Sequence, residues 1–423
     1  MGGKAIAVMA GLILCYALLA RRLTLANVTA PMLSVLAGMF VFSSSDVDID
    51  AGFVHAMAEI TLVLILFHDA STVRLGQLKR DPGIALRLLA IGFPLALLAS
   101  FLVSYWMLPA LGLAGAWLLA AAITPTDAGL GAPTVLNPVV PLRVRRGLNV
   151  ESGLNDGLAT PAVLVALGVL AEHEKAPIPG LFGVGTVPVV LALVCAVLIP
   201  LAAAWSMDQS RERHLSGRRG RQIGTLALPF LLFGVADLVG ANAFIAAFVG
   251  GLVFGGSSIT LAEDHETAGL LETASDLLGF VVWFFFGGLL LLVLAAGFDW
   301  RWLAIAILAL TVLRMGPVAL AMIGSGFRWP TVAFLGWFGP RGLATIVFGL
   351  LTVDELGPGS PHIRAVTGVL AMTVLLSVFA HGFSAGPLSQ AYGEWVARTN
   401  DPVAREPSVE PLSLRGRSAH EPP

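Results

Sequence analysis

Long apolar runs recur along the whole 423-residue chain, separated by short stretches rich in polar residues, proline and glycine. A helix needs about 17–25 mainly apolar residues to cross roughly 30 Å of hydrocarbon, and runs such as 187–205 have that length. The strands of a transmembrane barrel would be about 10 residues long and would alternate in polarity, which these runs do not. Charged residues make up only 12% of the chain, against about 25% in soluble domains. The sequence therefore predicts an all-α polytopic membrane protein.

When the sequence is divided at its polar, proline and glycine residues, the lengths of the apolar runs predict about thirteen transmembrane helices. The expected spans are 4–20, 27–43, 54–74, 83–108, 112–136, 146–171, 184–205, 222–238, 241–257, 270–296, 299–324, 330–353 and 365–388. The break between the eighth and ninth spans, at 237–240, is the weakest of these boundaries.

Basic residues are distributed unequally between the loops of the two sides. With these spans, 19 of the 25 Lys and Arg residues lie on one side and four on the other, while Arg314 and Arg341 fall within spans. Basic loops stay in the cytoplasm, so we expect a protein of the cell (inner) membrane with its N-terminus outside and its C-terminus in the cytoplasm. Residues 1–390 are expected to form the transmembrane domain. Residues 391–423 are polar and rich in proline, which predicts a short disordered cytoplasmic tail.

Two of the expected spans carry matching interruptions. Residues 124–126 (Thr-Pro-Thr) break the fifth span, and residues 339–342 (Gly-Pro-Arg-Gly) break the twelfth. An odd offset between two spans reverses their direction, and broken helices at corresponding places of two inverted halves mark the midplane site of many transporters. Proline alone also kinks membrane helices, but each break here lies beside an ionisable residue. We therefore predict inverted repeats with two broken, crossing helices.

The sixth span contains an unusual polar block, residues 151–156. In a helix over 146–171, Ser152 and Asp156 are neighbours at i,i+4, as are Glu151 and Asn155. All four side chains then share one face of the helix. Ionisable groups are costly in hydrocarbon and by default mark functional sites, so this face is a candidate site.

Asp127, which follows the first break, is expected to approach Asp156 near the middle of the membrane. Two carboxylates in a low-dielectric cleft hold a proton more tightly, and an entering cation stabilises the ionised form and displaces that proton. Carboxylate, hydroxyl and amide oxygens suit hard cations. The predicted site, at which a cation and a proton compete, consists of Asp156, Asp127, Ser152, Thr126 and Asn155. All of these except Asn155 are expected to be ligands of the metal cation.

Glu151 has a different expected role. Charges within a membrane almost always pair, so Glu151 is predicted to form a structural ion pair with Arg314. Arg341 is a possible accessory residue near the site, and the alternative is that its side chain snorkels to the interface.

Four further titratable residues have weaker interpretations. Asp69 either lines a cytoplasmic funnel or is simply interfacial. Asp237 either simply belongs to the weak break at 237–240 or has a conformational or structural role there. His68 and His381 titrate near neutral pH when unperturbed, but a lone histidine at a membrane boundary is usually uninvolved.

Five segments together resemble the NhaP-type sodium/proton antiporters of the cation/proton antiporter superfamily, in its monovalent cation:proton antiporter-1 branch. They are residues 66–70, 124–127, 151–156, 240–248 and 339–343. The resemblance covers roughly residues 5–388 and implies thirteen helices, a core domain that moves against a dimerisation domain, and a homodimer. It further implies that Asp156 is the ion-binding acid, assisted by Asp127, Ser152 and the backbone near Thr126, and that Glu151 and Arg314 are the family's ion pair.

Two positions differ among the proteins that this chain resembles. The related electrogenic branch carries Asp-Asp where this chain has Asn155-Asp156, so the resemblance implies electroneutral 1:1 exchange. His68 stands near where many relatives place an acid, which leaves the role of His68 open.

The expected function is secondary antiport of Na⁺, with Li⁺ or K⁺ as alternatives, against H⁺. No cofactor, no enzymatic activity and no nucleic-acid partner are expected, only membrane lipid and a second copy of the chain. Oxygen ligands alone do not separate Na⁺ from K⁺, so a K⁺/H⁺ antiporter of the same fold remains an alternative. An intramembrane hydrolase is disfavoured because the chain lacks His-Glu-x-x-His, Gly-x-Gly-Asp and Gly-x-Ser-Gly motifs. A channel would not need titratable acids at a helix break, and an organic-anion symporter would prefer Ser, Asn and Gln over Asp.

Overall fold

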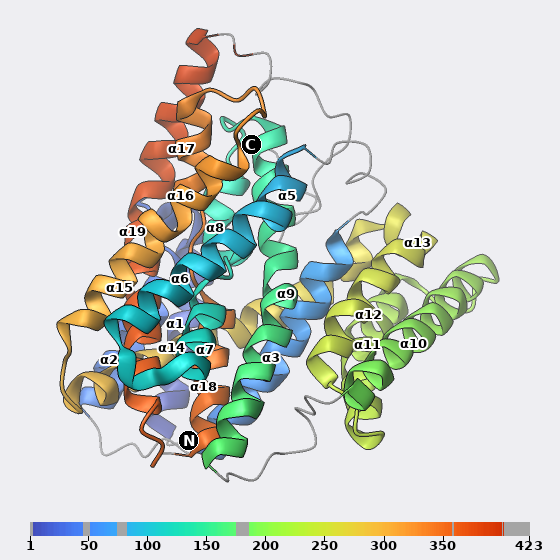
Figure 1. Ribbon diagram of the computed structural model, residues 1–423. Helices are drawn as coiled ribbons and strands as arrows, with labels where there is room; N and C mark the ends of the chain where they lie inside the picture. The colour runs from blue at the N-terminus through green and yellow to red at the C-terminus, as the bar shows by residue number, and fades with distance from the viewer. Residues whose placement is uncertain are drawn as a thin grey trace.

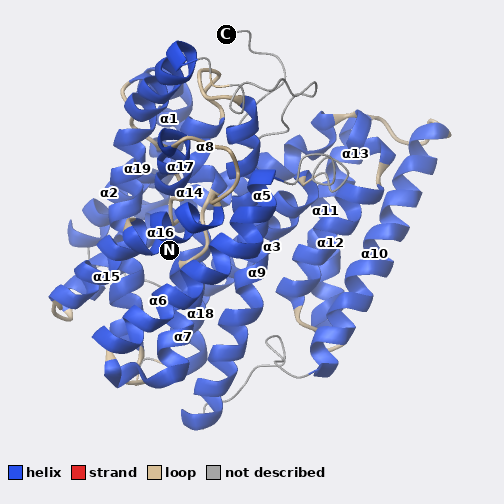
Figure 2. Cartoon of the chain, turned by 45° about the horizontal axis from the view of Figure 1, so that its top comes forward, coloured by secondary structure: helices blue, strands red, loops and turns tan. Residues whose placement is uncertain are grey.

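The computed structural model describes residues 3–44, 51–73, 83–174, 186–357, 359–399 and 401. Within these ranges every regular element is a helix (Figure 2). Among the described residues, ten helical stretches, some made of consecutive helices, are long and apolar enough to cross a membrane, and two shorter apolar helices cover 30–43 and 243–257. The predicted all-α polytopic fold is confirmed. The count of about thirteen spans stays a prediction.

The helices pack into two groups, and each helix makes its most extensive contacts within its own group. The first group consists of α1 (Gly3–Leu25), α2 (Ala30–Ser44), α3 (Ala51–Thr72), α10 (Thr186–Glu212), α11 (Arg218–Leu238), α12 (Ala243–Ser257), α13 (Ile259–Glu263), η4 (His265–Ala268) and α14 (Gly269–Ala295). In Figure 1, α10 to α13 lie on the right of the molecule.

The second group contains the interrupted helices. It consists of α5 (Gly83–Arg87), η1 (Leu88–Gly92), α6 (Phe93–Met107), η2 (Pro109–Leu111), α7 (Gly112–Ile123), α8 (Ala128–Val135), α9 (Leu142–Glu174), α15 (Trp300–Leu310), α16 (Val312–Ala321), α17 (Trp329–Trp337), α18 (Leu343–Leu356) and α19 (Ile363–Thr399). Figure 1 shows α3 and α9 side by side between the left and right parts of the molecule, and the two helices are in contact.

Side-chain caps explain where several helices begin. The side chain of Asn242 accepts a hydrogen bond of 2.9 Å from the backbone N–H of Ile245 at the start of α12. Asp299 caps α15 in the same way through the N–H of Arg301, also at 2.9 Å. Asn and Asp are preferred at this position because their oxygens satisfy donors that the helix leaves free. The weak break predicted at 237–240 is therefore a true helix boundary, and Gly240 turns it with φ +68°.

Glycines bring α12 directly against α3. A Cβ atom on Gly251 would lie 2.4 Å from the carbonyl oxygen of Phe67, and one on Gly255 would lie 2.1 Å from that of Ser71. Small residues allow two membrane helices to approach at backbone distance. This packing fixes the part of α3 that carries His68 and Asp69.

The structure differs from the predicted spans in three places. The last helix continues to Thr399, so residues 391–399 are not tail, because Tyr392 and Val396 are buried against the second group. Residues 402–423 lie outside the described residues.

The predicted span 299–324 is divided at Thr311, whose hydroxyl donates to the carbonyl oxygen of Ile307 at 2.6 Å and so competes with the backbone hydrogen bonds of the helix. The predicted span 83–108 contains the π-helical turn η1 just before Pro94, which has no N–H to continue the helix.

Candidate functional site

The two predicted helix breaks meet inside the second group. α7 ends at Ile123 and α8 starts at Ala128, while α17 ends at Trp337 and α18 starts at Leu343. The backbone N–H of Asp127 in the first break donates to the carbonyl oxygen of Pro340 in the second, at 2.8 Å. The prediction of two broken helices that cross is confirmed by this contact.

Asp127 caps two helices at once. Its Oδ1 accepts from the N–H of Leu130 in α8 at 2.9 Å, and its Oδ2 accepts from the N–H of Leu343 in α18 at 2.7 Å. Helix N-termini carry partial positive charge and favour anions, so the buried carboxylate complements both ends. A Cβ on Gly342 would lie 1.9 Å from Oδ2 of Asp127. Only glycine leaves room for this arrangement.

Arg341 caps helix C-termini, as Asp127 caps helix N-termini. Its guanidinium donates to the carbonyl oxygens of Thr124 and of Pro125 (3.0 Å for the latter) at the end of α7, and to that of Ala309 in α15 at 3.4 Å. Arg341 is only 2% exposed, so the snorkelling alternative is wrong. The acid of the first break thus caps the N-terminus of the helix after the second break, and the arginine of the second break caps the C-terminus of the helix before the first.

The first break is also tied to α9. The hydroxyl oxygens of Thr126 and Ser152 lie 2.8 Å apart. The amide of Asn155 uses both of its ends, because Nδ2 donates to Oγ1 of Thr126 at 2.7 Å and Oδ1 accepts from the N–H of Thr126 at 3.2 Å. Asp156, 6% exposed, lies one turn along α9 from Ser152 on the same helix face. The structure therefore brings Thr126, Ser152 and Asn155 together beside Asp156.

Glu151 and Arg314 form the expected ion pair. Nη2 of Arg314 donates to Oε2 of Glu151 at 2.7 Å, and Nη1 donates to Oε1, so the pair is bidentate. Both side chains are at most 3% exposed. A Cβ on Gly339 would lie 2.5 Å from Nε of Arg314 and 3.0 Å from Cγ2 of Thr126. The pair is therefore packed against both breaks.

The two remaining predicted accessory residues, Asp69 and Asp237, lie in different environments. Asp69 is 7% exposed and faces α9, since a Cβ on Gly153 would lie 3.7 Å from the Cβ of Asp69. Asp69 is thus buried against the site-bearing helix, and His68 beside it is 2% exposed. Asp237 is exposed at the end of α11, so the structure does not bring it to the buried cluster.

His381 is the residue that the sequence interpretation missed. Its Nε2 lies 2.9 Å from the carbonyl oxygen of Trp337, the last residue of α17, and its Nδ1 lies 3.0 Å from that of Ser377. The hydroxyl of Ser377 accepts a hydrogen bond of 2.6 Å from the backbone N–H of Arg341. Through this pair α19 contacts the second break, a structural role that the sequence interpretation did not assign to His381. Its spacing of four residues from Ser377 on one helix face was the available signal.

The donor set of the cluster is one of oxygens. The hydroxyls of Thr126 and Ser152 lie 2.8 Å apart, and the carboxylate of Asp156 belongs to the same face of α9 as Ser152. Such ligands suit alkali cations rather than soft metals. Among the described residues no group of three or more His, Cys, Asp or Glu side chains is placed to hold a resident metal ion.

Comparison with known proteins points to transporters. Over 313 residues the chain is 24% identical to the Na(+)/H(+) antiporter of Schizosaccharomyces pombe, covering 66% of this chain and 65% of that protein. It is also 24% identical to Na(+)/H(+) antiporter 2 of Zygosaccharomyces rouxii, covering 66% of this chain but only 38% of that protein. The chain thus spans less than two thirds of the length of these two relatives.

The fold has a counterpart among solved structures. The sodium proton antiporter MjNhaP1 from Methanocaldococcus jannaschii, at pH 8, superposes with a TM-score of 0.70 at 22% identity, covering 92% of this chain and 99% of that one. The family described as "Sodium/hydrogen exchanger, transmembrane" matches residues 8–391. With most of its length matched, and with two broken helices crossing beside buried carboxylates, the chain belongs to the sodium/hydrogen exchanger family.

Proposed function

We propose that the protein is a secondary active antiporter that exchanges Na⁺ for H⁺ at Asp156. The observation that carries this proposal is the buried oxygen cluster of Thr126 and Ser152 at the crossing of the two breaks, with Asp156 on the same face of α9. A proton and a cation then occupy this carboxylate in turn, because binding of either one removes the charge that attracts the other.

The neighbouring charges support a single exchanging carboxylate. Asp127 accepts from two helix N-termini, an environment that suits a permanent anion. Glu151 is matched by Arg314. In the proposed mechanism Asp127 holds the two helix N-termini and offers an oxygen ligand through its remaining lone pairs, while Asp156 takes up and releases the proton.

Asn155 supports electroneutral 1:1 exchange. Its amide both donates to and accepts from Thr126. An ionised aspartate has acceptors only, so it would need the threonine hydroxyl to turn and donate, and it would add a second negative charge beside Asp156. With asparagine, one carboxylate carries either one proton or one monovalent cation through the cycle.

Na⁺ is the proposed cation because the relatives and the structural counterpart are named as Na⁺/H⁺ antiporters. Li⁺ fits the same ligands, and the K⁺ alternative is less favoured. We further propose that the protein lies in the cell (inner) membrane as a homodimer, with its N-terminus outside and its C-terminus in the cytoplasm, as the distribution of basic residues supports.

Reconstitution into liposomes tests the exchange. Wild-type protein is expected to dissipate a pH gradient on addition of Na⁺, equally with and without a membrane potential. Asp156→Asn is expected to abolish exchange, and Ser152→Ala to raise the apparent KM for Na⁺. Glu172→Gln, which changes an exposed acid on the same helix, serves as control and is expected to leave exchange unchanged. Persistent activity in Asp156→Asn would overturn the proposal.

A further inference from the structure

A polar contact at one end of the molecule joins the two helix groups. Nε2 of His55 in α3 lies 3.3 Å from Oε1 of Glu59, on the same helix, and 3.6 Å from Oδ2 of Asp354 in α18. Glu355, next to Asp354, is only 5% exposed. α3 belongs to the first group and α18 to the second. The proposed transport site plays no part in this cluster.

The cluster contains unsatisfied atoms. Within the part of the chain that the structure describes, Nδ1 of His55 and Oε1 of Glu355 are buried without a hydrogen-bond partner. Buried polar atoms without partners cost free energy, so the contact is not optimised for permanence. On the proposed orientation, the N-terminal end of α3 and the C-terminal end of α18 both lie at the outer face.

We propose that His55 and Asp354, with Glu59 and Glu355, form a proton-dependent latch that holds the two helix groups together at the outer face. This inference rests on the proposed function, because an outer latch has a role only in a transporter that opens to the outside. Opening there requires α18 to move away from α3, which separates His55 from Asp354.

The charge of His55 decides whether the latch holds. The charged groups that act on it are Glu59 from α3 and Asp354 and Glu355 from α18. A protonated imidazole lies between carboxylates of both helices and attracts them together. A neutral imidazole leaves three carboxylates that repel one another. Acidification of the outside therefore favours the closed latch, and alkaline conditions favour its release.

Exchange measurements with a fixed internal pH test the latch. Acidification of the outside also affects competition at Asp156, so the readout is the rate of each variant divided by the wild-type rate at the same pH. For Asp354→Asn this ratio is expected to rise about three- to fivefold as the outside is acidified, the scale of one partly exposed ion pair. His55→Gln is expected to behave alike, and Glu172→Gln to keep a constant ratio. Constant ratios in both latch variants would overturn the proposal.

A charge exchange separates the latch from a general loss of structure. The double variant His55→Asp with Asp354→His restores the pair in reverse and is expected to recover the wild-type pH profile. Asp354 is 48% exposed, so its substitution is expected to leave folding intact even where a change at His55 does not. A double variant that behaves like the single variants counts against the latch.

A labelling experiment reads the same contact without transport. Ala58 is fully buried, one turn along α3 from His55. In a background of Cys15→Ala and Cys195→Ala, which removes both native cysteines, an impermeant maleimide is applied from outside to Ala58→Cys. At a fixed acidic pH, labelling is expected to be about three- to fivefold faster with Asp354→Asn than without it. Equal rates overturn the latch, whereas failure of wild-type exchange with unequal labelling overturns only the proposed function.

Discussion

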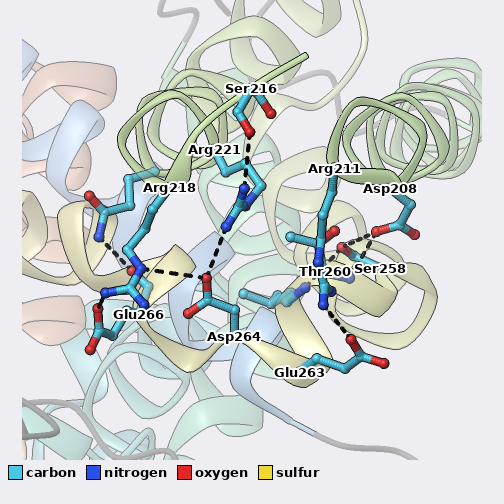
Figure 3. A network of polar contacts seen from close by, with 12 residues as sticks. Asp208, Arg211, Ser216, Arg218, Arg221, Ser258, Thr260, Glu263, Asp264 and Glu266 are labelled. Carbon is cyan, nitrogen blue, oxygen red and sulfur yellow. Dashed lines mark hydrogen bonds and ion pairs between the residues drawn. The ribbon is translucent and has the colours of Figure 1, made fainter. Parts of the chain in front are cut away.

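Two polar regions of this molecule use the same residue types in opposite settings. At the crossing of the broken helices, Glu151 and Arg314 are at most 3% exposed. The network between α10, α11 and the α13–η4 segment (Figure 3) instead pairs Arg211 with Glu263 at 2.6 Å and Arg221 with Asp264 at 3.2 Å. The side chains of Arg211 and Glu263 are 36% and 58% exposed.

This contrast in exposure decides which charges matter most for the stability of the fold. A charge left alone in the buried crossing has no water to replace its partner. A charge left alone at the exposed pair of Arg211 and Glu263 is solvated by water, and salt screens what remains. The network connects elements of the first group, whereas the crossing determines the geometry at Asp156.

The largest expected effect comes from the buried ion pair. Glu151→Gln leaves Arg314 as a buried charge without its anion and is expected to destabilise the protein by about 3–5 kcal/mol. Thermal unfolding in detergent measures this loss, and Glu172→Gln on the same helix is the control. The double variant Glu151→Gln with Arg314→Gln is expected to regain part of the stability. Equal melting of Glu151→Gln and wild type would contradict the comparison.

The next effect concerns the space beside Asp127. Gly342→Ala places a Cβ 1.9 Å from Oδ2 of Asp127, so the carboxylate must leave the N–H of Leu343. A cost of about 2–3 kcal/mol is expected from overpacking and the lost cap, with a large fall in exchange rate. Gly256→Ala, where a Cβ meets nothing within 4 Å, is the matched control. The two alanine variants should differ in both melting temperature and activity.

A smaller effect is expected at α19. Ser377→Ala removes the acceptor for the backbone N–H of Arg341 and is expected to cost about 1–2 kcal/mol. Thr373→Val removes a hydroxyl that donates to the carbonyl of Val369 in its own helix, and it provides the comparison in unfolding experiments. If both substitutions shift the unfolding midpoint equally, Ser377 does not position the second break.

The smallest effect belongs to the α10–α13 network. Arg211→Gln removes an exposed ion pair and is expected to cost no more than about 1 kcal/mol, a difference that disappears in high salt. Unfolding at low and high ionic strength measures it. A loss as large as that of Glu151→Gln would remove the distinction between the two regions.

The sequence predicts what depends on hydrophobicity, spacing and charge balance. The apolar runs predict the helices, Pro125 and Pro340 predict the breaks, and the scarcity of charges within spans predicts the pair of Glu151 with Arg314. The polar face of α9 follows from helical periodicity.

The remaining features depend on backbone groups and on distant contacts. The second helix that Asp127 caps is reached through the N–H of Leu343, which any residue except proline would supply. His381 reaches the second break through the carbonyl oxygen of Trp337, and in the sequence only its spacing from Ser377 indicates this contact. The division at Thr311 depends on a local hydroxyl-to-carbonyl bond, and the extension of α19 to Thr399 depends on tertiary packing; hydropathy contains neither.

The reciprocal capping by Asp127 and Arg341 has a consequence for biogenesis. A ribosome makes the first break long before Leu343, so the nascent α7 and α8 enter the bilayer without the guanidinium and the N–H that later complete them. The crossing of the two breaks is therefore completed only once the chain has been inserted as far as Leu343. A nascent chain stopped short of residue 340 should remain protease-sensitive around Asp127, while the helices of the first group made by then are already packed.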